Sequence, residues 1–166
     1  MSKDWQEDVR DFHEKCGLEV NTLPSLPSED TLNLRMKLVD EEVNEELLPL
    51  LSSLAKKGAW DSETFAEDLA SIADGIVDAI YVLLGTAVSF GIDLQPIWDA
   101  TQTANMQKYK GPKREDGKIL KPEGWKHPDV KELIENQLLT LSKGEVRKIE
   151  KNFYVDDYME RSDRSK

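Results

Sequence analysis

The sequence predicts an all-α protein, a four-helix-bundle-type domain whose core is completed by oligomerisation. Apolar residues recur at helical spacing over long stretches, glycines and prolines separate these stretches, and no stretch alternates as a strand does. The apolar faces are too extensive for a lone small bundle, which favours association of several copies. The 166 residues suit one domain, expected at 1–141, followed by a polar tail at 142–166.

Two helices are predicted in the first sixty residues. The first covers Asp4 to Cys16, ends at Gly17, and has an apolar face made of Trp5, Val9 and Phe12. Prolines and turn-forming residues make 18–30 an extended linker. A long helix follows from about Asp30 to Lys57, because its apolar residues step by three or four positions. Pro49 lies inside it, so we expect a kink or a local opening there.

A third helix is predicted from Ser62 to about Phe90, with Gly91 ending it. It contains the apolar stretch 76–92, which is shorter than the about 20 residues of a membrane-spanning helix. The stretch also contains Asp78 and lacks basic flanks. We therefore interpret it as a buried helix of a soluble protein, with no membrane as partner.

The last third of the chain is predicted to contain two shorter helices. Asp93 caps a helix that has Pro96 in its first turn and runs to about Lys108. Residues 110–128 are rich in Gly, Pro and Lys and predict a loop, with a short hairpin as an option at GKIL. A final helix is expected at 129–141.

Composition excludes some classes of function. The formal net charge is −11, from 22 basic and 33 acidic residues, which argues against nucleic acid as a partner. Cys16 is the only cysteine, so an intramolecular disulfide and a cysteine-based zinc site are excluded. The first residues have no apolar signal-peptide core. These features fit a reducing compartment, and we expect the cytoplasm.

The charge is unevenly distributed along the chain. Residues 28–78 carry 13 acidic and four basic residues, whereas residues 104–127 carry seven basic and three acidic ones. Carboxylates bind hard cations, and Lys and Arg neutralise phosphate. Acidic helices followed by a basic segment therefore suit a metal ion with a polyphosphate.

Two groups of acids are candidates for binding that metal. In the segment DEEVNEE at 40–46, an α-helical projection places Glu42 and Glu46 beside the apolar stripe, and Glu45 one turn from Glu41 and Glu42. A solvated helix face is the alternative. Asp78, with Asp74 one turn earlier, lies in an apolar helix, where a buried carboxylate must be paired or bind metal. A buried salt bridge or a cap-like hydrogen bond is the alternative for Asp78.

The ordered motifs resemble a known superfamily. Glu41-Glu42-x-x-Glu45, followed by a carboxylate pair ending at Asp78, resembles the EExxE…ExxD signature of MazG-like all-α nucleoside triphosphate pyrophosphohydrolases. The likeness continues through the segments LRMKLVDEE, DGIVDAIYVLLGTAVSFGID, TANMQK and REDGKILKPEGWKHPD. It looks nearest to the dimeric-dUTPase-like and phage branches. A strict ExxD needs an acid at position 75, which is Gly75 here, and we expect Asp74 to take its place.

The resemblance implies cleavage between the α- and β-phosphates of a nucleoside triphosphate, giving the monophosphate and pyrophosphate. Mg²⁺ or Mn²⁺ is then the cofactor, held by Glu42, Glu45, Asp74 and Asp78. Glu41 is the candidate general base. A phage-type relative would favour dGTP, and a dUTPase-like one dUTP or dCTP. A homodimer or a dimer of dimers is also implied, and a catalytically inactive module that binds nucleotide or protein is the alternative.

Four residues in the basic third of the chain are candidates for substrate binding, namely Asn105, Lys108, Arg114 and Lys121. Asn105 and Lys108 share a helical face, where an amide suits a base or sugar and an ammonium suits phosphate. Their alternative role is to end the helix. For Tyr81 and Trp125, stacking on a base and a core position are both open. For His13, a place in the lining of a nucleotide pocket and a surface or packing role are both open.

Overall fold

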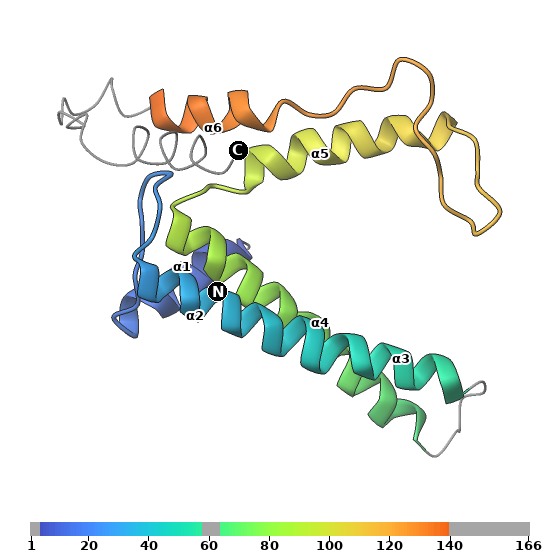
Figure 1. Cartoon of the computed structure of the whole chain (residues 1–166), viewed down its shortest axis with the longest axis horizontal. Coiled ribbons are helices and arrows are strands. Elements are labelled where there is room, and N and C mark those ends of the chain that lie inside the picture. The colour runs from blue at the N-terminus through green and yellow to red at the C-terminus, as the bar shows by residue number, and fades with distance from the viewer. Residues whose placement is uncertain (1–3, 58–63, 140–166) are drawn as a thin grey trace, which may run out of the picture.

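The computed structural model describes residues 4–57 and 64–139. Over these ranges the chain is helical, and its one pair of β-bridged residues, Lys113 and Ile119, belongs to no named strand. The all-α class predicted from the sequence is confirmed. The elements, shown in Figure 1, are α1 (Trp5–Lys15), α2 (Glu29–Val39), the π-helix η1 (Asp40–Leu47), α3 (Leu48–Lys57), α4 (Phe65–Phe90), α5 (Gln95–Gln107), the 3₁₀ turn η2 (Lys108–Lys110) and α6 (Val130–Leu139).

The predicted long helix at 30–57 is present as three successive segments, α2, η1 and α3. Its middle segment is a π-helix, in which the N–H of Leu48 donates to the carbonyl of Val43, five residues earlier. Pro49 follows directly. A proline has no N–H to donate and its ring clashes with the carbonyl four residues before it, and a widened turn relieves both constraints. The local opening predicted at Pro49 is confirmed.

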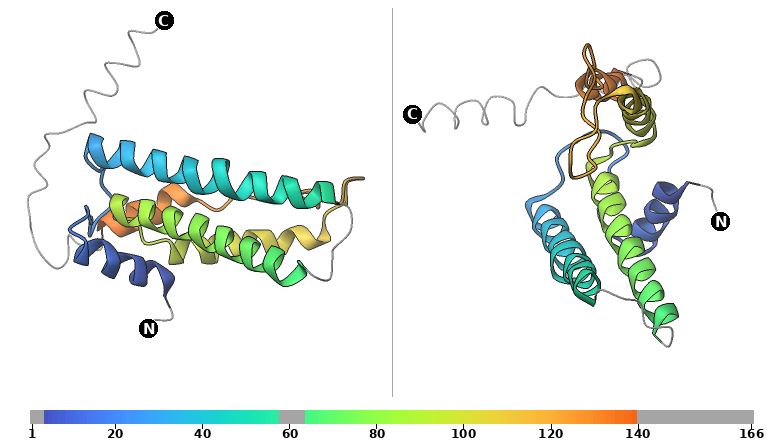
Figure 2. Two further views of the ribbon diagram at one scale, coloured as in Figure 1. Left: turned by 90° about the horizontal axis from the view of Figure 1, so that it is seen from below. Right: turned by 90° about the vertical axis from the view of Figure 1, so that its right-hand side faces the viewer.

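Three rods form the body of the molecule. Helix α4 lies in the middle, with the α2–η1–α3 rod along one side and α1 along the other (Figure 2). Helices α5 and α6 contact each other and leave this body at an angle, so the chain has the shape of an open V (Figure 1). The loop between η2 and α6 contains the predicted hairpin, with the N–H of Arg114 donating to the carbonyl of Lys118 at 2.7 Å.

The joint of the V is the end of α4. Gly91 has a φ of +66°, a left-handed conformation typical of helix ends, and its N–H bonds to the last carbonyls of α4. The linker between α1 and α2 is fixed to the same end, because the N–H of Asn21 bonds to Val88 and that of Ser25 to Phe90. This prediction, a helix ended by Gly91, is confirmed.

The stretch 76–92, predicted to be a buried helix, is buried toward its C-terminal end and largely exposed toward its N-terminal end in the single chain. The fully buried residues of α4 are Ala79, Gly85, Ala87, Val88 and Ser89, a short strip near its C-terminal end. Val77 and Leu83 are 57% and 51% exposed. By length and composition α4 is apolar enough to cross a membrane, with 22% of the most apolar window buried. Helical periodicity shows which face is apolar, but two neighbouring rods cover only part of it.

The apolar face predicted for α1 is also only partly buried. Val9 is 1% exposed, whereas Trp5 is 64% and Phe12 46% exposed. The residues that join Val9 in the interior are Gln6 and His13. Gln6 connects α1 to the joint of the V, since its side-chain amide bonds to the backbone of Ile92 and Leu94.

Candidate functional site

Acidic residues from two helices meet at Glu42. This side chain is half-buried on η1. Burial raises the pKa of the Glu42 carboxyl, and the neighbouring charges of Glu46, Asp78, Glu41 and Asp74 raise it further. These acids of η1 and α4 therefore each lie close enough to Glu42 to repel its charge. We call these five residues the carboxylate cluster.

The π-helix moves Glu45 away from Glu42. In an α-helix Glu45 would lie next to Glu41 and Glu42, but the wider turn of η1 shifts the later side chains. Glu46 is the η1 neighbour whose charge acts most strongly on the pKa of Glu42, and Glu45 does not contribute, although both side chains are exposed. Glu46 was predicted to lie beside the apolar stripe but was not among the predicted ligands. Pro49 was the signal that could have indicated the changed register.

Asp78 is exposed, which corrects the argument that it must be buried and therefore paired. Within the described residues it forms no ion pair, so water stabilises its charge. The apolar residues around it on α4 are largely uncovered as well. Asp78 nevertheless contributes to the raised pKa of Glu42 across the helix pair.

The structure explains how Gly75 fits beside this cluster. A Cβ at position 75 would lie 3.5 Å from Cδ1 of Leu47 and 3.9 Å from Cδ2 of Leu50. Position 75 therefore faces the apolar contact between α4 and the rod η1–α3. Asp74, one residue earlier, acts on Glu42 instead. The Cβ of an acidic residue at position 75 would therefore contact the side chains of Leu47 and Leu50.

The carboxylate cluster has the right donor chemistry for a hard divalent cation, although its side chains do not converge. No group of three His, Cys, Asp or Glu side chains within 4–57 and 64–139 is arranged to hold a metal ion. Glu46, Asp74 and Asp78 are exposed and Glu41 and Glu42 half-buried, so none of the five side chains is enclosed by the protein. A cation would relieve the repulsion at Glu42, and oxygen ligands suit Mg²⁺ and Mn²⁺.

Glu41 is half-buried and forms an ion pair with Lys37, one turn earlier, at 3.4 Å. Both side chains are substantially exposed, so the pair contributes little to stability. It does hold the Glu41 carboxylate on the outer side of η1.

A second cluster lies on the other arm of the V, where the loop after η2 returns to α5. The ammonium groups of Lys108 and Lys121 stand 4.8 and 4.4 Å from the centre of the Trp125 ring. The indole N–H of Trp125 donates to the carbonyl of Ala104 at 2.7 Å, which fixes the ring against α5. Asn105 accepts from Lys108 at 2.7 Å, and Lys121 contacts Nε2 of His127 at 2.7 Å. We call Asn105, Lys108, Lys121, Trp125 and His127 the cationic cluster.

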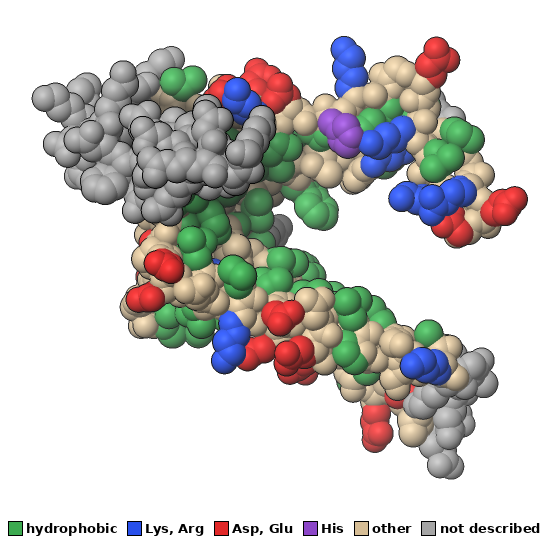
Figure 3. Space-filling view, in the orientation of Figure 1, with side chains coloured by type: hydrophobic (Ala, Val, Ile, Leu, Met, Phe, Trp, Pro, Cys, Tyr) green, Lys and Arg blue, Asp and Glu red, His purple; other side chains and the backbone are tan. Residues whose placement is uncertain are grey.

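The cationic cluster unites three of the four predicted substrate-binding residues, Asn105, Lys108 and Lys121. Arg114 lies apart, on the hairpin, where its guanidinium binds the carboxylate of Asp116. This hydrogen-bonded contact raises the pKa of Arg114 and lowers that of Asp116. Figure 3 shows acidic side chains over the lower arm, and Lys and Arg side chains beside acidic ones on the loop of the upper arm.

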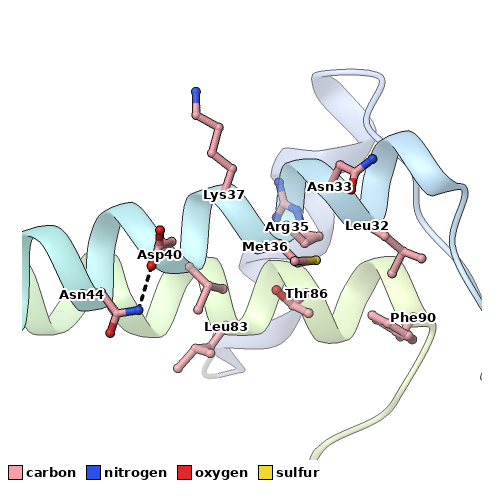
Figure 4. A pocket seen from close by; sticks show the side chains of 11 residues that line it. Leu32, Asn33, Arg35, Met36, Lys37, Asp40, Asn44, Leu83, Thr86 and Phe90 are labelled. Carbon is pink, nitrogen blue, oxygen red and sulfur yellow. Dashed lines mark hydrogen bonds between the residues drawn. The ribbon is translucent and has the colours of Figure 1, made fainter.

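A cleft of about 870 Å³ lies between the α2–η1 rod and α4 (Figure 4). Its walls are mainly apolar, formed by Leu32, Met36, Leu83 and Phe90. At one end Asn44 donates to Asp40 at 2.8 Å. None of the predicted site residues lines it. Arg35 and Asp40 also line it, and Asp40 directly precedes Glu41 of the carboxylate cluster.

Comparison with known protein families shows which family the chain belongs to. A family model described as phosphoribosyl-ATP pyrophosphohydrolase (PRA-PH) matches residues 9–105, more than half of the chain. The chain belongs to the PRA-PH family. No curated protein matches it.

The PRA-PH match confirms the predicted resemblance in its broader form, that of a MazG-like, all-α pyrophosphohydrolase-related family. It supports hydrolysis of a nucleotide at a pyrophosphate linkage. The matched residues run from α1 into α5 and include the whole carboxylate cluster. Of the cationic cluster they include only Asn105, so the basic loop lies beyond the part of the chain that matches the PRA-PH model.

Proposed function

We propose that this PRA-PH member cleaves a deoxynucleoside triphosphate between its α- and β-phosphates, releasing the monophosphate and pyrophosphate. The observation that carries the proposal is the carboxylate cluster, where five acids of η1 and α4 gather within the matched residues. Such a concentration of negative charge is unfavourable unless a cation joins it. A metal-bound polyphosphate is the substrate that suits it.

In this proposal Glu42, Asp74 and Asp78 would hold Mg²⁺ or Mn²⁺, together with Glu46 of the carboxylate cluster or with Glu45, the ligand predicted from the sequence. The ion would neutralise phosphate charge and acidify a water molecule. Glu41, which pairs with Lys37 at 3.4 Å, would accept the proton of that water. Lys108 and Lys121 neutralise phosphate oxygens that the metal does not reach.

The test is pyrophosphate release with Mn²⁺, measured on the canonical NTPs and dNTPs and on phosphoribosyl-ATP. We expect turnover of dNTPs, with dGTP preferred and dUTP or dCTP as the other outcome. Phosphoribosyl-ATP is in the panel because the family description names it. Turnover of phosphoribosyl-ATP alone would contradict the proposal of a deoxynucleoside triphosphate as substrate.

A second candidate function is a catalytically inactive module that binds nucleotide. Gly75 favours it, because the strict motif has an acid where this chain has an apolar contact. The two candidates separate in the same panel of substrates. Binding of triphosphates without any pyrophosphate release would select the inactive module.

The two lysines of the cationic cluster give a prediction on affinity. Lys108→Met and Lys121→Met should each raise KM about tenfold, because each removes a charge-assisted contact to phosphate. The kcat should change less than KM, as expected for uniform binding. Lys131→Met is the matched control, since Lys131 lies on α6 and pairs with Glu135. An unchanged KM in both variants would remove the cluster from the substrate site.

We further propose that a second copy of the chain covers the exposed face of α4, as a homodimer or a dimer of dimers. Val77, Leu83 and Met36 are 57%, 51% and 71% exposed. Asp74 and Asp78 on the same helix argue against burial of this face in a lipid bilayer.

Association predicts that Leu83→Asp gives monomers, because it places a charge in the centre of the covered face. Sedimentation of the wild type should give two or four times the 18.9 kDa of the chain. Thr103→Asp, on α5 and exposed, is the control. A wild type that sediments as a monomer at all concentrations would contradict the proposal.

A further inference from the structure

Arg35 of α2 is a buried cation, 6% exposed, at the place where α1, α2 and α4 meet. No carboxylate within the described residues pairs with it. Its Nη1 lies 3.3 Å from Nε2 of His13, and its Nε has no hydrogen-bond partner. Burying an unpaired guanidinium is costly, and an unsatisfied donor adds to the cost. Such a side chain is expected where a ligand completes its contacts.

Gly85 of α4 makes room for this pair. A Cβ at position 85 would lie 2.5 Å from Nη1 of Arg35 and 2.9 Å from Nε2 of His13. Burial lowers the pKa of His13, and the charge of Arg35 lowers it further. The imidazole is therefore neutral, and Nε2 accepts from the guanidinium, which has only donors. His13 thus orients the fork of Arg35.

The pair lies along the same helices as the carboxylate cluster. Arg35 precedes Glu42 by seven residues and Gly85 follows Asp78 by seven, which is about 10 Å along each helix. Arg35 lines the cleft between the α2–η1 rod and α4, and so does Asp40, which directly precedes Glu41 of the carboxylate cluster. A nucleotide whose phosphates lie at the cluster would extend its base along this cleft toward Arg35.

We propose that Arg35 recognises a guanine base by donating to its O6 and N7, and that His13 is a positioning residue for this contact. The inference rests on the proposed function and specifies the nucleobase of its substrate. A guanidinium fork matches two adjacent acceptors, the pattern that guanine presents. Adenine presents an amino donor beside N7, and pyrimidines have no N7, so both are disfavoured.

The experiment compares base analogues in the wild type and in Arg35→Met. With the wild type, 7-deaza-dGTP should show a kcat/KM about 10- to 100-fold below that of dGTP, the loss of one bond to a charged donor. We expect dITP, which keeps O6 and N7, to remain close to dGTP. In Arg35→Met, the kcat/KM values for dGTP and 7-deaza-dGTP should be equal, because the contact that distinguishes them is gone. Arg10→Met, at an arginine of α1 that pairs with Glu7, is the matched control and should keep the wild-type ratio.

His13 is tested by the same ratio. His13→Gln keeps an acceptor and should keep the preference for dGTP over 7-deaza-dGTP, whereas His13→Leu should lose it. A merely structural role would lower turnover of both analogues alike. Equal turnover of dGTP and 7-deaza-dGTP by the wild type overturns the inference, whatever the variants do.

The outcome stays distinct from that of the proposed function. If no triphosphate is hydrolysed, the proposed function fails, and calorimetric binding of the same intact analogues still tests the base contact. A weaker affinity for 7-deaza-dGTP than for dGTP would then support it, and equal affinities would overturn it.

Discussion

Glu42→Gln should abolish pyrophosphate release and at the same time stabilise the metal-free protein. The substitution keeps the shape of the side chain and removes one charge from the middle of the carboxylate cluster, where burial and four neighbouring acids raise the pKa of Glu42. Loss of a ligand should lower kcat/KM by more than about 100-fold, since even outer-shell changes at metal sites cost 10- to 100-fold. Differential scanning calorimetry without divalent ions should show a higher Tm than the wild type.

The response of the Tm to Mn²⁺ shows whether Glu42→Gln removes a metal ligand or only stabilises the folded protein. Mn²⁺ should raise the Tm of the wild type, because a ligand of the folded state stabilises it by mass action, and should do so much less in Glu42→Gln. Glu132→Gln, at an exposed acid of α6, is the control and should retain the response. A Glu42→Gln protein that is less stable than the wild type, yet still stabilised by Mn²⁺, would refute the assignment.

The raised pKa of Glu42 also fixes the sign of a pH dependence. Because the pKa is higher in the folded chain than in the unfolded chain, the folded state binds more protons in the range between the two values. The free energy of unfolding of the metal-free protein, as far as Glu42 determines it, therefore falls as the pH rises through this range. Urea titrations at several pH values should show a weaker fall in Glu42→Gln than in the wild type.

The sequence predicted the helices well because their signals are local. Apolar spacing, the glycines at positions 17 and 91, and the proline-rich linker mark helix ends without reference to the rest of the fold. The spacing of Asn105 and Lys108 placed them in contact in the same way. Pro49 was recognised as a point of opening. Its consequence, a π-helix that keeps Glu46 but not Glu45 beside Glu42, depends on how the turn relaxes.

Properties that depend on other elements could not be predicted in this way. The burial of α4 depends on how many neighbours cover it, and Asp78 was misjudged for the same reason. Arg35 was not singled out in the sequence and His13 was open between a nucleotide pocket and a packing role, because only the crossing of α1, α2 and α4 at Gly85 brings the two together and buries them. Trp125 gains its two lysine neighbours through the return of a loop.

Gly91→Ala should be among the most destabilising substitutions in the chain, by about 3 kcal/mol or more. Position 91 has a φ of +66°, which costs a residue with a Cβ about 1–2 kcal/mol. The added Cβ would also overlap the carbonyl of Leu23 and lie 2.8 Å from its nitrogen. Both partners are backbone, so neither can rotate away, and the linker must separate from the end of α4. The loss corresponds to a fall in Tm of about 10 °C for a chain of this size.

Gly17→Ala isolates the part of this effect that comes from the close approach. Gly17 ends α1 with the same φ of +66°, but a Cβ there would meet nothing within 4 Å. Its substitution should therefore cost only the left-handed conformation, about 1–2 kcal/mol. The difference between the two variants in urea-induced unfolding measures the contact of the linker with α4. Equal losses at positions 17 and 91 would mean that the linker moves aside at no cost, and that the joint of the V does not depend on Gly91.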